Sequence, residues 1–194
     1  MLAPTNVPLR QRQSHVWARD PGDFYVEPEW CSQRLFDVHS FVGEVIDPAC
    51  GCGRVVEAAR RAHHASEGWD AVDRGFPGTK VRDFLSTDTV VCNFVSNPPF
   101  GIAEAFVEHA LLHALHQVVM LLPMTWLCGE RRSRWLETTP LVGVLVLTPR
   151  PSMPPGAAVA AAGGGTRDFA WFIWSRNYMG RPRVGWLHRD KMEE

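Results

Sequence analysis

The most distinctive chemistry in this sequence lies in four consecutive residues, Asn97, Pro98, Pro99 and Phe100. They directly follow an apolar run at residues 90–95 that is typical of a strand. Proline lacks a backbone N–H group and stiffens a turn. The Pro98 carbonyl oxygen and the Asn97 side-chain oxygen could therefore face one amino group and accept both of its hydrogens. The Phe100 ring offers a flat face to a planar base, so the segment indicates chemistry on an exocyclic amino group.

A second segment combines two glycines with an acidic residue, between an expected strand and an expected helix. Asp47 ends the short apolar run at residues 42–46, Gly51 and Gly53 follow, and residues 54–64 have a helix-favouring composition. Glycines let the backbone approach a ligand closely, and a helix N-terminus presents free N–H groups. The pattern predicts a nucleotide-like cofactor in a Rossmann-type sheet, although an ordinary tight turn would use the same glycines.

Acidic residues follow the next expected strand. Asp70 lies 17 positions after Gly53, where a carboxylate can accept both ribose hydroxyls of an adenosine cofactor. Asp73 could fill the same role. Further along the chain, Asp83 could accept a hydrogen bond from an adenine amino group, with the Phe84 ring against the base.

Strand-like and helix-like segments alternate along the chain, which predicts an α/β fold with a mostly parallel sheet and helices on both faces. The expected strands are residues 42–46, 65–69, 90–95, 118–122, 141–147 and 169–174. The expected helices are residues 54–64, 103–116 and 129–137. Residues 25–41 indicate a turn followed by a further helix, with Trp30, Leu35 and Phe36 on one apolar side.

The pattern predicts one catalytic domain at residues 23–176, between a flexible N-terminal tail at 1–22 and a C-terminal tail at 177–194. Residues 151–168, which include a proline pair, an alanine run and three consecutive glycines at 163–165, form a long loop between two expected strands. A loop of that length is usually functional or disordered, and we expect it on the substrate side. No separate target-recognition domain is expected.

Composition places the chain among soluble globular proteins. Of the 194 residues, 45% are hydrophobic and 21% are charged. The longest apolar run is about 11 residues against the roughly 20 that a bilayer span needs, and the N-terminus does not resemble a signal peptide. Five cysteines without an export signal are typical of reduced thiols, so the expected compartment is the cytoplasm.

Charge is distributed unevenly although the net charge is only −1. Residues 31–130 carry 7 basic and 12 acidic side chains, whereas residues 131–190 carry 9 basic and 3 acidic ones. This distribution favours two surfaces with different partners, although chance clustering on a solvated surface would look the same. His109, His113 and His116 share helical spacing but do not complete a zinc ligand set, so no metal is expected.

Together these motifs resemble class I S-adenosylmethionine-dependent methyltransferases. More narrowly, the order of the motifs resembles adenine-N6 DNA methyltransferases of the short form common in bacteriophages and prophages, over about residues 23–176. The resemblance implies a Rossmann-like, seven-stranded, mostly parallel sheet and S-adenosyl-L-methionine as cofactor. It implies methyl transfer to the N6 amino group of adenine in DNA, with the base flipped out of the duplex. We expect a monomer or weak homodimer without a membrane partner, in a bacterial or phage-infected host cell.

The resemblance also implies roles for individual residues. The residues implied to bind the cofactor are Tyr25, Pro28, Asp47, Ala49, Gly51, Gly53, Asp70, Asp83, Phe84 and Asn97. The residues implied to catalyse the transfer are Asn97, Pro98, Pro99 and Phe100. The residues expected at the flipped base and its strand are Phe100, Trp171, Phe169 and Arg167.

Three features depart from the family pattern. In the segment from Tyr25 to Pro28, Glu27 stands where the family often has threonine. Phe100 stands where tyrosine is more common. Specific members carry a sequence-recognition region after the catalytic half, and no such region is expected here because only about twenty residues follow the last expected strand. Four alternatives remain open: an RNA methyltransferase acting on adenine N6 or guanine N2, a protein glutamine methyltransferase, a non-catalytic subunit that binds cofactor or nucleic acid, and a nicotinamide-dependent oxidoreductase. An oxidoreductase of that kind would have no use for the amino-group chemistry that residues 97–100 indicate.

Overall fold

A computed structural model describes residues 22–154, 156 and 165–189. Most of the predicted N-terminal tail, and half of the loop predicted at residues 151–168, lie outside the described residues. The strands are β1 (Val45–Asp47), β2 (Ser66–Asp70), β3 (Lys80–Val81), β4 (Val91–Ser96), β5 (Ala114–Pro123), β6 (Leu141–Thr148), β7 (Phe169–Ser175) and β8 (Arg183–His188). The helices are α1 (Glu29–Val38), α2 (Arg54–Arg61), α3 (Ala103–His113) and α4 (Glu130–Glu137), with 3-10 turns η1 (Phe84–Ser86) and η2 (Met124–Leu127).

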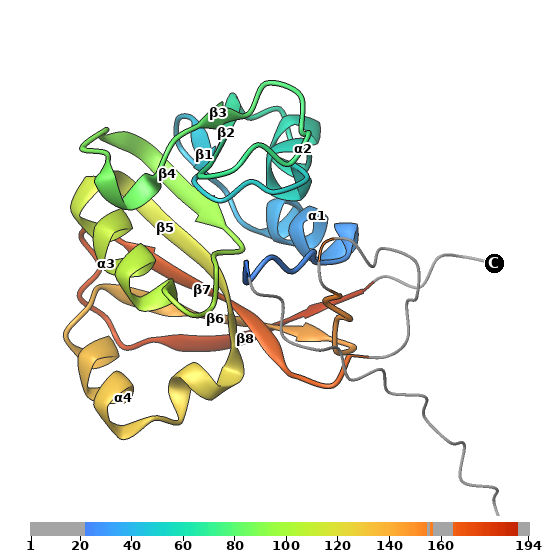
Figure 1. Cartoon of the computed structure of the whole chain (residues 1–194). Helices are drawn as coiled ribbons and strands as arrows, with labels where there is room; N and C mark the ends of the chain where they lie inside the picture. Colours follow the sequence, from blue (N-terminus) through green and yellow to red (C-terminus); the bar gives the residue numbers. More distant parts are fainter. Residues whose placement is uncertain (1–21, 155, 157–164, 190–194) are drawn as a thin grey trace, which may run out of the picture.

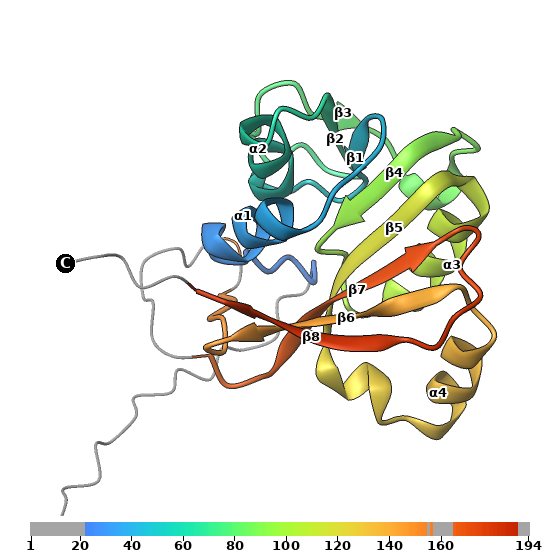
Figure 2. The ribbon, with the colours of Figure 1, turned by 180° about the vertical axis from the view of Figure 1, so that it is seen from behind.

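The strands form one sheet in the order β3-β2-β1-β4-β5-β7-β6-β8 (Figure 1). Strands β1 to β5 pair in parallel, β7 runs antiparallel between β5 and β6, and β8 is parallel to β6. Helices cover both faces, with α1 and α2 on one side and α3 on the other (Figures 1 and 2). The predicted α/β class and mostly parallel sheet are confirmed.

The sheet has eight strands, so the expectation of seven is wrong. Lys80–Val81 adds a short edge strand beside β2. At the other edge, Arg183–His188 pairs with β6, although the sequence suggested that residues 177–194 are a tail. Gly143 explains the second pairing, because a Cβ atom there would collide with the Arg183 backbone. This close approach of two backbones is a tertiary contact, and strand periodicity did not reveal it.

The central strand β7 divides the core into two layers. Its side chains alternate between a cluster that contains Phe172 and Trp174 and a cluster that contains Trp171 and Ile173. The first cluster includes residues of α3 and the second includes residues of α1 and α2. Because both faces of β7 are covered, the strand is apolar at nearly every position rather than at alternate ones.

The chain order in the sheet creates the crevice in which α/β proteins bind ligands. β1 pairs with β2 on one side and with β4 on the other. The chain therefore adds β2 and β3 outward on one side of β1 and then returns to add β4 and β5 on the other side. The carboxyl ends of these parallel strands meet at one edge, which is the usual ligand position at such a reversal. Asp47, Asp70 and Ser96 are the last residues of the three strands and therefore lie at this edge.

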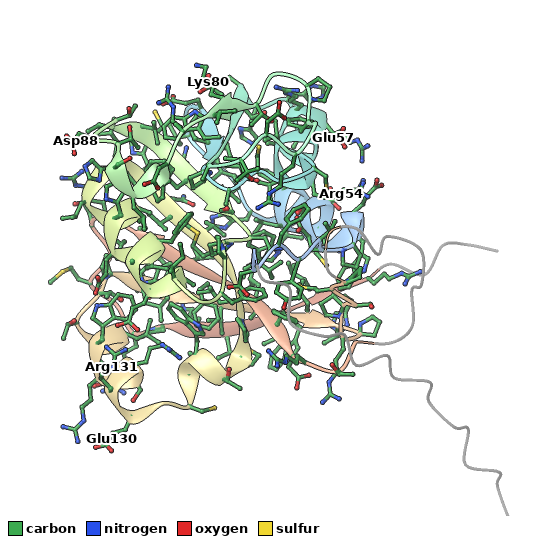
Figure 3. The ribbon with its side chains drawn as sticks, viewed as in Figure 1. Arg54, Glu57, Lys80, Asp88, Glu130 and Arg131 are labelled. Atoms are coloured by element: carbon green, nitrogen blue, oxygen red, sulfur yellow. The ribbon has the colours of Figure 1, made fainter. Side chains whose placement is uncertain are left out.

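Some of the basic side chains in residues 131–190 form ion pairs within the molecule. Arg131 donates two hydrogen bonds of 2.6 Å to the Glu104 carboxylate, and Arg134 pairs with Glu130 at 2.8 Å. Figure 3 shows Glu130 and Arg131 together on the outer surface of α4. These arginines therefore contribute less to an electrostatic surface than the charge count indicates. None of the helices in the described part of the chain has the length and apolar character that crossing a bilayer requires.

Candidate active site

A pocket opens at the carboxyl ends of β1, β2 and β4. Its walls are a strap at residues 22–27, the glycine loop at residues 47–54 and the turn after β4 at residues 97–100, with Asp70 and Arg74 at one side. The predicted site residues that line it are Tyr25, Asp47, Ala49, Gly51, Asp70, Asn97, Pro98, Pro99 and Phe100. The structure thus brings the glycine-loop motif and the Asn-Pro-Pro-Phe motif to opposite walls of one pocket.

The glycine loop curves tightly into α2. Gly51 and Gly53 have φ angles of +52° and +85°, in the left-handed region that favours glycine. Gly53 is the N-cap residue of α2, and a Cβ atom there would collide with the Phe76 ring. Gly53 does not line the pocket and instead sets the direction in which the helix leaves it.

We expect Gly53→Ala to lower the free energy of unfolding by about 1–3 kcal/mol, because alanine would be strained at this φ and would displace Phe76. Urea unfolding measures this change. Gly78→Ala is a matched control, since Gly78 has the same φ of +85° with no atom within 4 Å of its Cβ position. Equal losses for the two variants would show that the collision with Phe76 has no effect.

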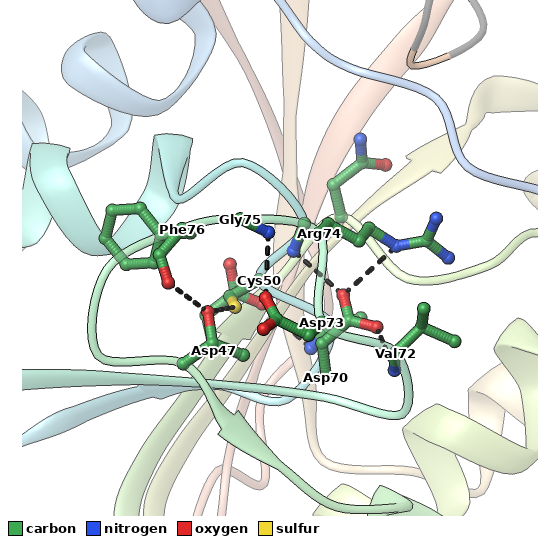
Figure 4. A network of polar contacts seen from close by, with 12 residues as sticks. Asp47, Cys50, Asp70, Val72, Asp73, Arg74, Gly75 and Phe76 are labelled. Atoms are coloured by element: carbon green, nitrogen blue, oxygen red, sulfur yellow. Dashed lines mark hydrogen bonds and ion pairs between the residues drawn. The ribbon is translucent and has the colours of Figure 1, made fainter.

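Asp70 faces the pocket and supports the glycine loop. Its side chain is 6% exposed and accepts hydrogen bonds from the backbone N–H groups of Gly51, at 2.9 Å, and Val72, at 3.0 Å. Arg74 lies on its other side, with Nε 3.5 Å from a carboxylate oxygen (Figure 4). Asp73 is exposed and accepts a hydrogen bond from Gly75 in its own turn. Of the two acids that the sequence left open, Asp70 is therefore the one placed to contact a ligand.

Asp47 is a buried carboxyl group at the floor of the pocket. It is 2% exposed and accepts hydrogen bonds from the Ser96 hydroxyl, at 2.6 Å, and from the Ala49 N–H, at 3.1 Å. Burial raises the pKa of Asp47 to about 8, and the nearby carboxylates of Glu27 and Asp70 add to the rise. A cation bound in the pocket would favour the ionised form.

This pKa predicts how stability depends on pH. In the unfolded chain Asp47 ionises near pH 4, whereas in the folded protein it ionises only near pH 8, so folding favours its protonated form. That contribution is complete below pH 4 and is lost as the pH rises to about 8. We expect Asp47→Asn to gain stability relative to the wild type between pH 5 and pH 8.5, measured by urea unfolding. A difference that does not change with pH would contradict the assignment.

The Asn97 side chain is held in one orientation. Its amide nitrogen donates hydrogen bonds to the Tyr25 carbonyl oxygen, at 2.8 Å, and to Glu27 Oε2, at 2.9 Å. Its amide oxygen, Oδ1, is buried and has no hydrogen-bond partner within the described structure. A buried acceptor without a partner is uncommon in proteins, and here it belongs to the residue whose oxygen is expected to bind an amino group.

Aromatic rings line the side of the pocket near Asn97. Phe100 stacks on Tyr25, with ring centroids 5.8 Å apart and planes inclined by 17°. Phe169 lies on Phe100 at 5.5 Å, although it does not line the pocket itself. Trp171 is fully buried and donates from its indole N–H to the Cys31 carbonyl oxygen at 3.0 Å. Its expected contact with a flipped base is not supported, because its β7 position points it into the core under α1.

Other predicted residues also lie away from the pocket. Phe84 is buried among aromatic rings of the core and contacts Phe94 and His109, each at 5.0 Å or less between centroids. Asp83 is exposed and caps η1 by accepting the Leu85 N–H. Neither residue lines the pocket, and the expected contact of Asp83 and Phe84 with the cofactor adenine stays a prediction. Pro28 and Arg167 do not line the pocket either, and Arg167 is exposed.

Sequence reasoning missed several residues that line the pocket, among them Phe24, Arg54 and Arg74. The Arg74 guanidinium lies 4.1 Å from the centre of the Phe24 ring. Three buried polar atoms without a hydrogen-bond partner in the described structure belong to pocket residues: Nε of Arg54, Nε of Arg74 and Oδ1 of Asn97. Arg54 directly follows the last glycine, which is the one sequence signal that could have indicated it. Within the described residues, no three metal-ligating side chains gather in a way that could hold a metal ion.

Comparison with solved structures finds methyltransferases of low sequence identity. A Pyrococcus horikoshii protein described as a candidate RNA methyltransferase aligns with a TM-score of 0.60 and 13% identity, over 84% of this chain and 93% of that one. The M protein of the type I restriction enzyme EcoKI aligns with a TM-score of 0.56 and 12% identity, over 79% of this chain and 44% of its own. Magnesium protoporphyrin IX methyltransferase of Synechocystis PCC 6803, solved with S-adenosylmethionine bound, aligns with a TM-score of 0.50 and 12% identity, over 75% and 76%.

No protein-family model and no curated protein matches the chain. Identities of this size show a shared fold, and the substrates named for those proteins belong to them alone. The strand order and the position of the pocket agree with that fold. The chain therefore has the Rossmann-like fold of class I S-adenosylmethionine-dependent methyltransferases.

Proposed function

We propose that this chain is an S-adenosylmethionine-dependent methyltransferase that methylates the N6 amino group of adenine in DNA. The observation that carries the proposal is the oriented, unpartnered Oδ1 of Asn97, a residue that lines the pocket. An amino group with two hydrogens satisfies that oxygen and the neighbouring Pro98 carbonyl together. The aromatic face of Phe100 beside them suits a planar base.

The polar groups of the pocket fit the proposed cofactor. S-adenosylmethionine carries two positive charges, on its sulfonium and ammonium groups, and one carboxylate. The carboxyl groups of Glu27, Asp47 and Asp70 suit the cationic groups and the ribose hydroxyls. The Arg54 Nε atom has no hydrogen-bond partner in the described structure, and the Arg74 Nε atom pairs only loosely with Asp70, at 3.5 Å, so both are donors that suit a carboxylate. When bound, the cofactor supplies a methyl group activated by the positive charge on sulfur.

The residues of the turn after β4 would activate the acceptor. The lone pair of an adenine amino group is delocalised into the ring and is weakly nucleophilic. Hydrogen bonds from its two hydrogens to Asn97 and Pro98 would favour a tetrahedral nitrogen and localise the lone pair, while Phe100 holds the ring. In a duplex this amino group cannot reach a pocket at the sheet edge, so the base must be flipped out.

RNA is a second candidate substrate. The structural similarity to the Pyrococcus horikoshii protein covers nearly all of that chain, which is described as a candidate RNA methyltransferase. An RNA acceptor that already presents unpaired bases would not need to be flipped out of a duplex.

The experiment is transfer of a tritiated methyl group from S-adenosylmethionine to duplex DNA, single-stranded DNA, RNA and a protein extract, each assayed separately. We expect label in DNA. Label confined to RNA or to protein would replace the proposed substrate, and no label in any acceptor would contradict the proposed activity.

A further inference from the structure

We infer that Glu27 is a positioning residue that sets the orientation of the Asn97 amide, so that Oδ1 faces the methyl acceptor. The inference rests on the proposed function and adds a residue that the glycine loop and the Asn-Pro-Pro-Phe motif do not include. Glu27 lies on the strap that forms one wall of the pocket, and Asn97 lies on the turn after β4, which contacts the strap. The contact between them joins residues 70 positions apart.

The contacts of Glu27 hold its carboxylate in place. Its side chain is 5% exposed, with Oε1 accepting from the Ser32 hydroxyl at 3.0 Å and Oε2 accepting from Asn97 Nδ2 at 2.9 Å. Ser32 is itself buried, in the first turn of α1. A carboxylate fixed by a buried hydroxyl of a helix has little freedom to move away from Asn97.

Glu27 makes the reversed orientation of the amide unfavourable. In the observed orientation both hydrogens of Asn97 Nδ2 meet acceptor oxygens, those of Tyr25 and Glu27. Rotation by 180° would place Oδ1 against the same two oxygens, with no hydrogen between them, and would turn the NH₂ group toward the acceptor base. One acceptor would bias the amide weakly, whereas two acceptors on the same side exclude the reversal.

The residue type matters for this role. A threonine hydroxyl, common at this position in the family that the sequence resembles, can either donate or accept and therefore does not select one amide orientation by itself. An ionised carboxylate can only accept. Burial raises the pKa of Glu27, whereas its hydrogen bonds from Asn97 and Ser32 and the charge of Arg54 lower it. Burial is the larger influence, so the pKa of Glu27 is raised overall. In either protonation state a carboxyl oxygen remains available to accept from Asn97 Nδ2.

Two substitutions of Glu27 separate the effect of its hydrogen-bond-accepting oxygen from the effect of its negative charge. Glu27→Gln and Glu27→Leu both remove the negative charge, but only leucine removes the acceptor. The glutamine oxygen can still accept from Asn97, while its NH₂ group faces the Ser32 hydroxyl, which can accept in turn. Loss of charge can weaken binding of the cationic cofactor in both variants, so kcat and KM must be measured separately.

We expect Glu27→Gln to retain kcat within about threefold of the wild type and Glu27→Leu to lower kcat by about 10- to 100-fold, because the reacting groups lose their alignment. KM for S-adenosylmethionine should change similarly in both. Equal kcat values for the two variants would overturn the inference. A wild-type protein without methyl transfer to any acceptor would instead contradict the proposed function, so the two failures are distinguishable.

A measurement on the wild-type protein covers the case in which Glu27→Leu does not fold. The side-chain amide hydrogens of Asn97 should exchange with solvent slowly in ¹⁵N-resolved NMR spectra, as should those of Asn93, which donates to the carbonyl oxygens of Val42 and Glu44. The exposed Asn177 is the fast-exchanging reference. Exchange of the Asn97 amide at the rate of Asn177 would show that its orientation is not held, and would overturn the inference.

Discussion

Asn97→Ala is expected to lower the rate of methyl transfer at least about 100-fold, the size of effect seen when one oriented hydrogen-bonding group is removed from the reacting atoms. Alanine removes the Oδ1 acceptor and leaves the Pro98 carbonyl as the single partner of the acceptor amino group. Affinity for S-adenosylmethionine should stay within about threefold, because the carboxyl groups Asp47 and Asp70 and the glycine loop remain. Single-turnover kinetics and calorimetric titration separate the two quantities.

The outcome for binding decides the role of Asn97. If cofactor affinity falls as much as the rate, Asn97 holds the cofactor and its assignment to the acceptor is wrong. Asn177→Ala is the control for asparagine replacement elsewhere, because Asn177 is exposed beyond the end of β7. It should change neither quantity.

Asp70→Ala is expected to weaken S-adenosylmethionine binding by roughly 10- to 150-fold, which corresponds to about 1.5–3 kcal/mol for a lost hydrogen bond to a charged group. The carboxylate is placed to accept from the ribose hydroxyls, and it also accepts from the Gly51 N–H. Its removal therefore loses a ligand contact and loosens the glycine loop. Calorimetric titration measures the change in affinity.

Two further variants test whether the loss of affinity is specific to Asp70 and how much of it comes from the ribose contact rather than from the glycine loop. Asp73→Ala should bind normally, because Asp73 is exposed and contacts the backbone of its own turn. Asp70→Asn can still accept from Gly51, so it should keep the loop and lose the charge-assisted part of the ribose contact. An Asp70→Ala variant with unchanged affinity, beside a weakened Asp73→Ala variant, would reverse the assignment of the two acids.

The parts of the fold that the sequence predicted are those that depend on local pattern. The apolar runs of β4, β5 and β7 and the helix-favouring composition of α2 were recognised because each is visible within one element. β8 was not, because its pairing with β6 depends on the missing side chain of Gly143 in another strand. The helix α1, Glu29–Val38, lies within residues 25–41, where the pattern predicted a turn followed by a helix, so this element was also recognised from local pattern.

The candidate site shows the same division. The carboxyl ends of neighbouring parallel strands share one edge of a sheet. This edge brings together Asp47 and Asp70, which end their strands, and Asn97, which follows β4. Phe84 and Trp171 were expected at the site from motif order, but side chains at these positions point into the core. The contacts of Glu27 and Arg74 depend on how the strap and a loop fold over the pocket, which no local pattern specifies.

The most direct test of the central claim is nucleoside mass spectrometry of unmethylated DNA after incubation with the protein and S-adenosylmethionine. Activation of an exocyclic amino group by Asn97 and Pro98 predicts N6-methyldeoxyadenosine, at a level that falls with Asn97→Ala. Methylation at a ring carbon or ring nitrogen would contradict the account, because such an acceptor has no pair of amino hydrogens for the two oxygens to accept. DNA that stays unmethylated with the wild-type protein, while RNA is methylated at an amino group, would retain the mechanism and reject DNA as the substrate.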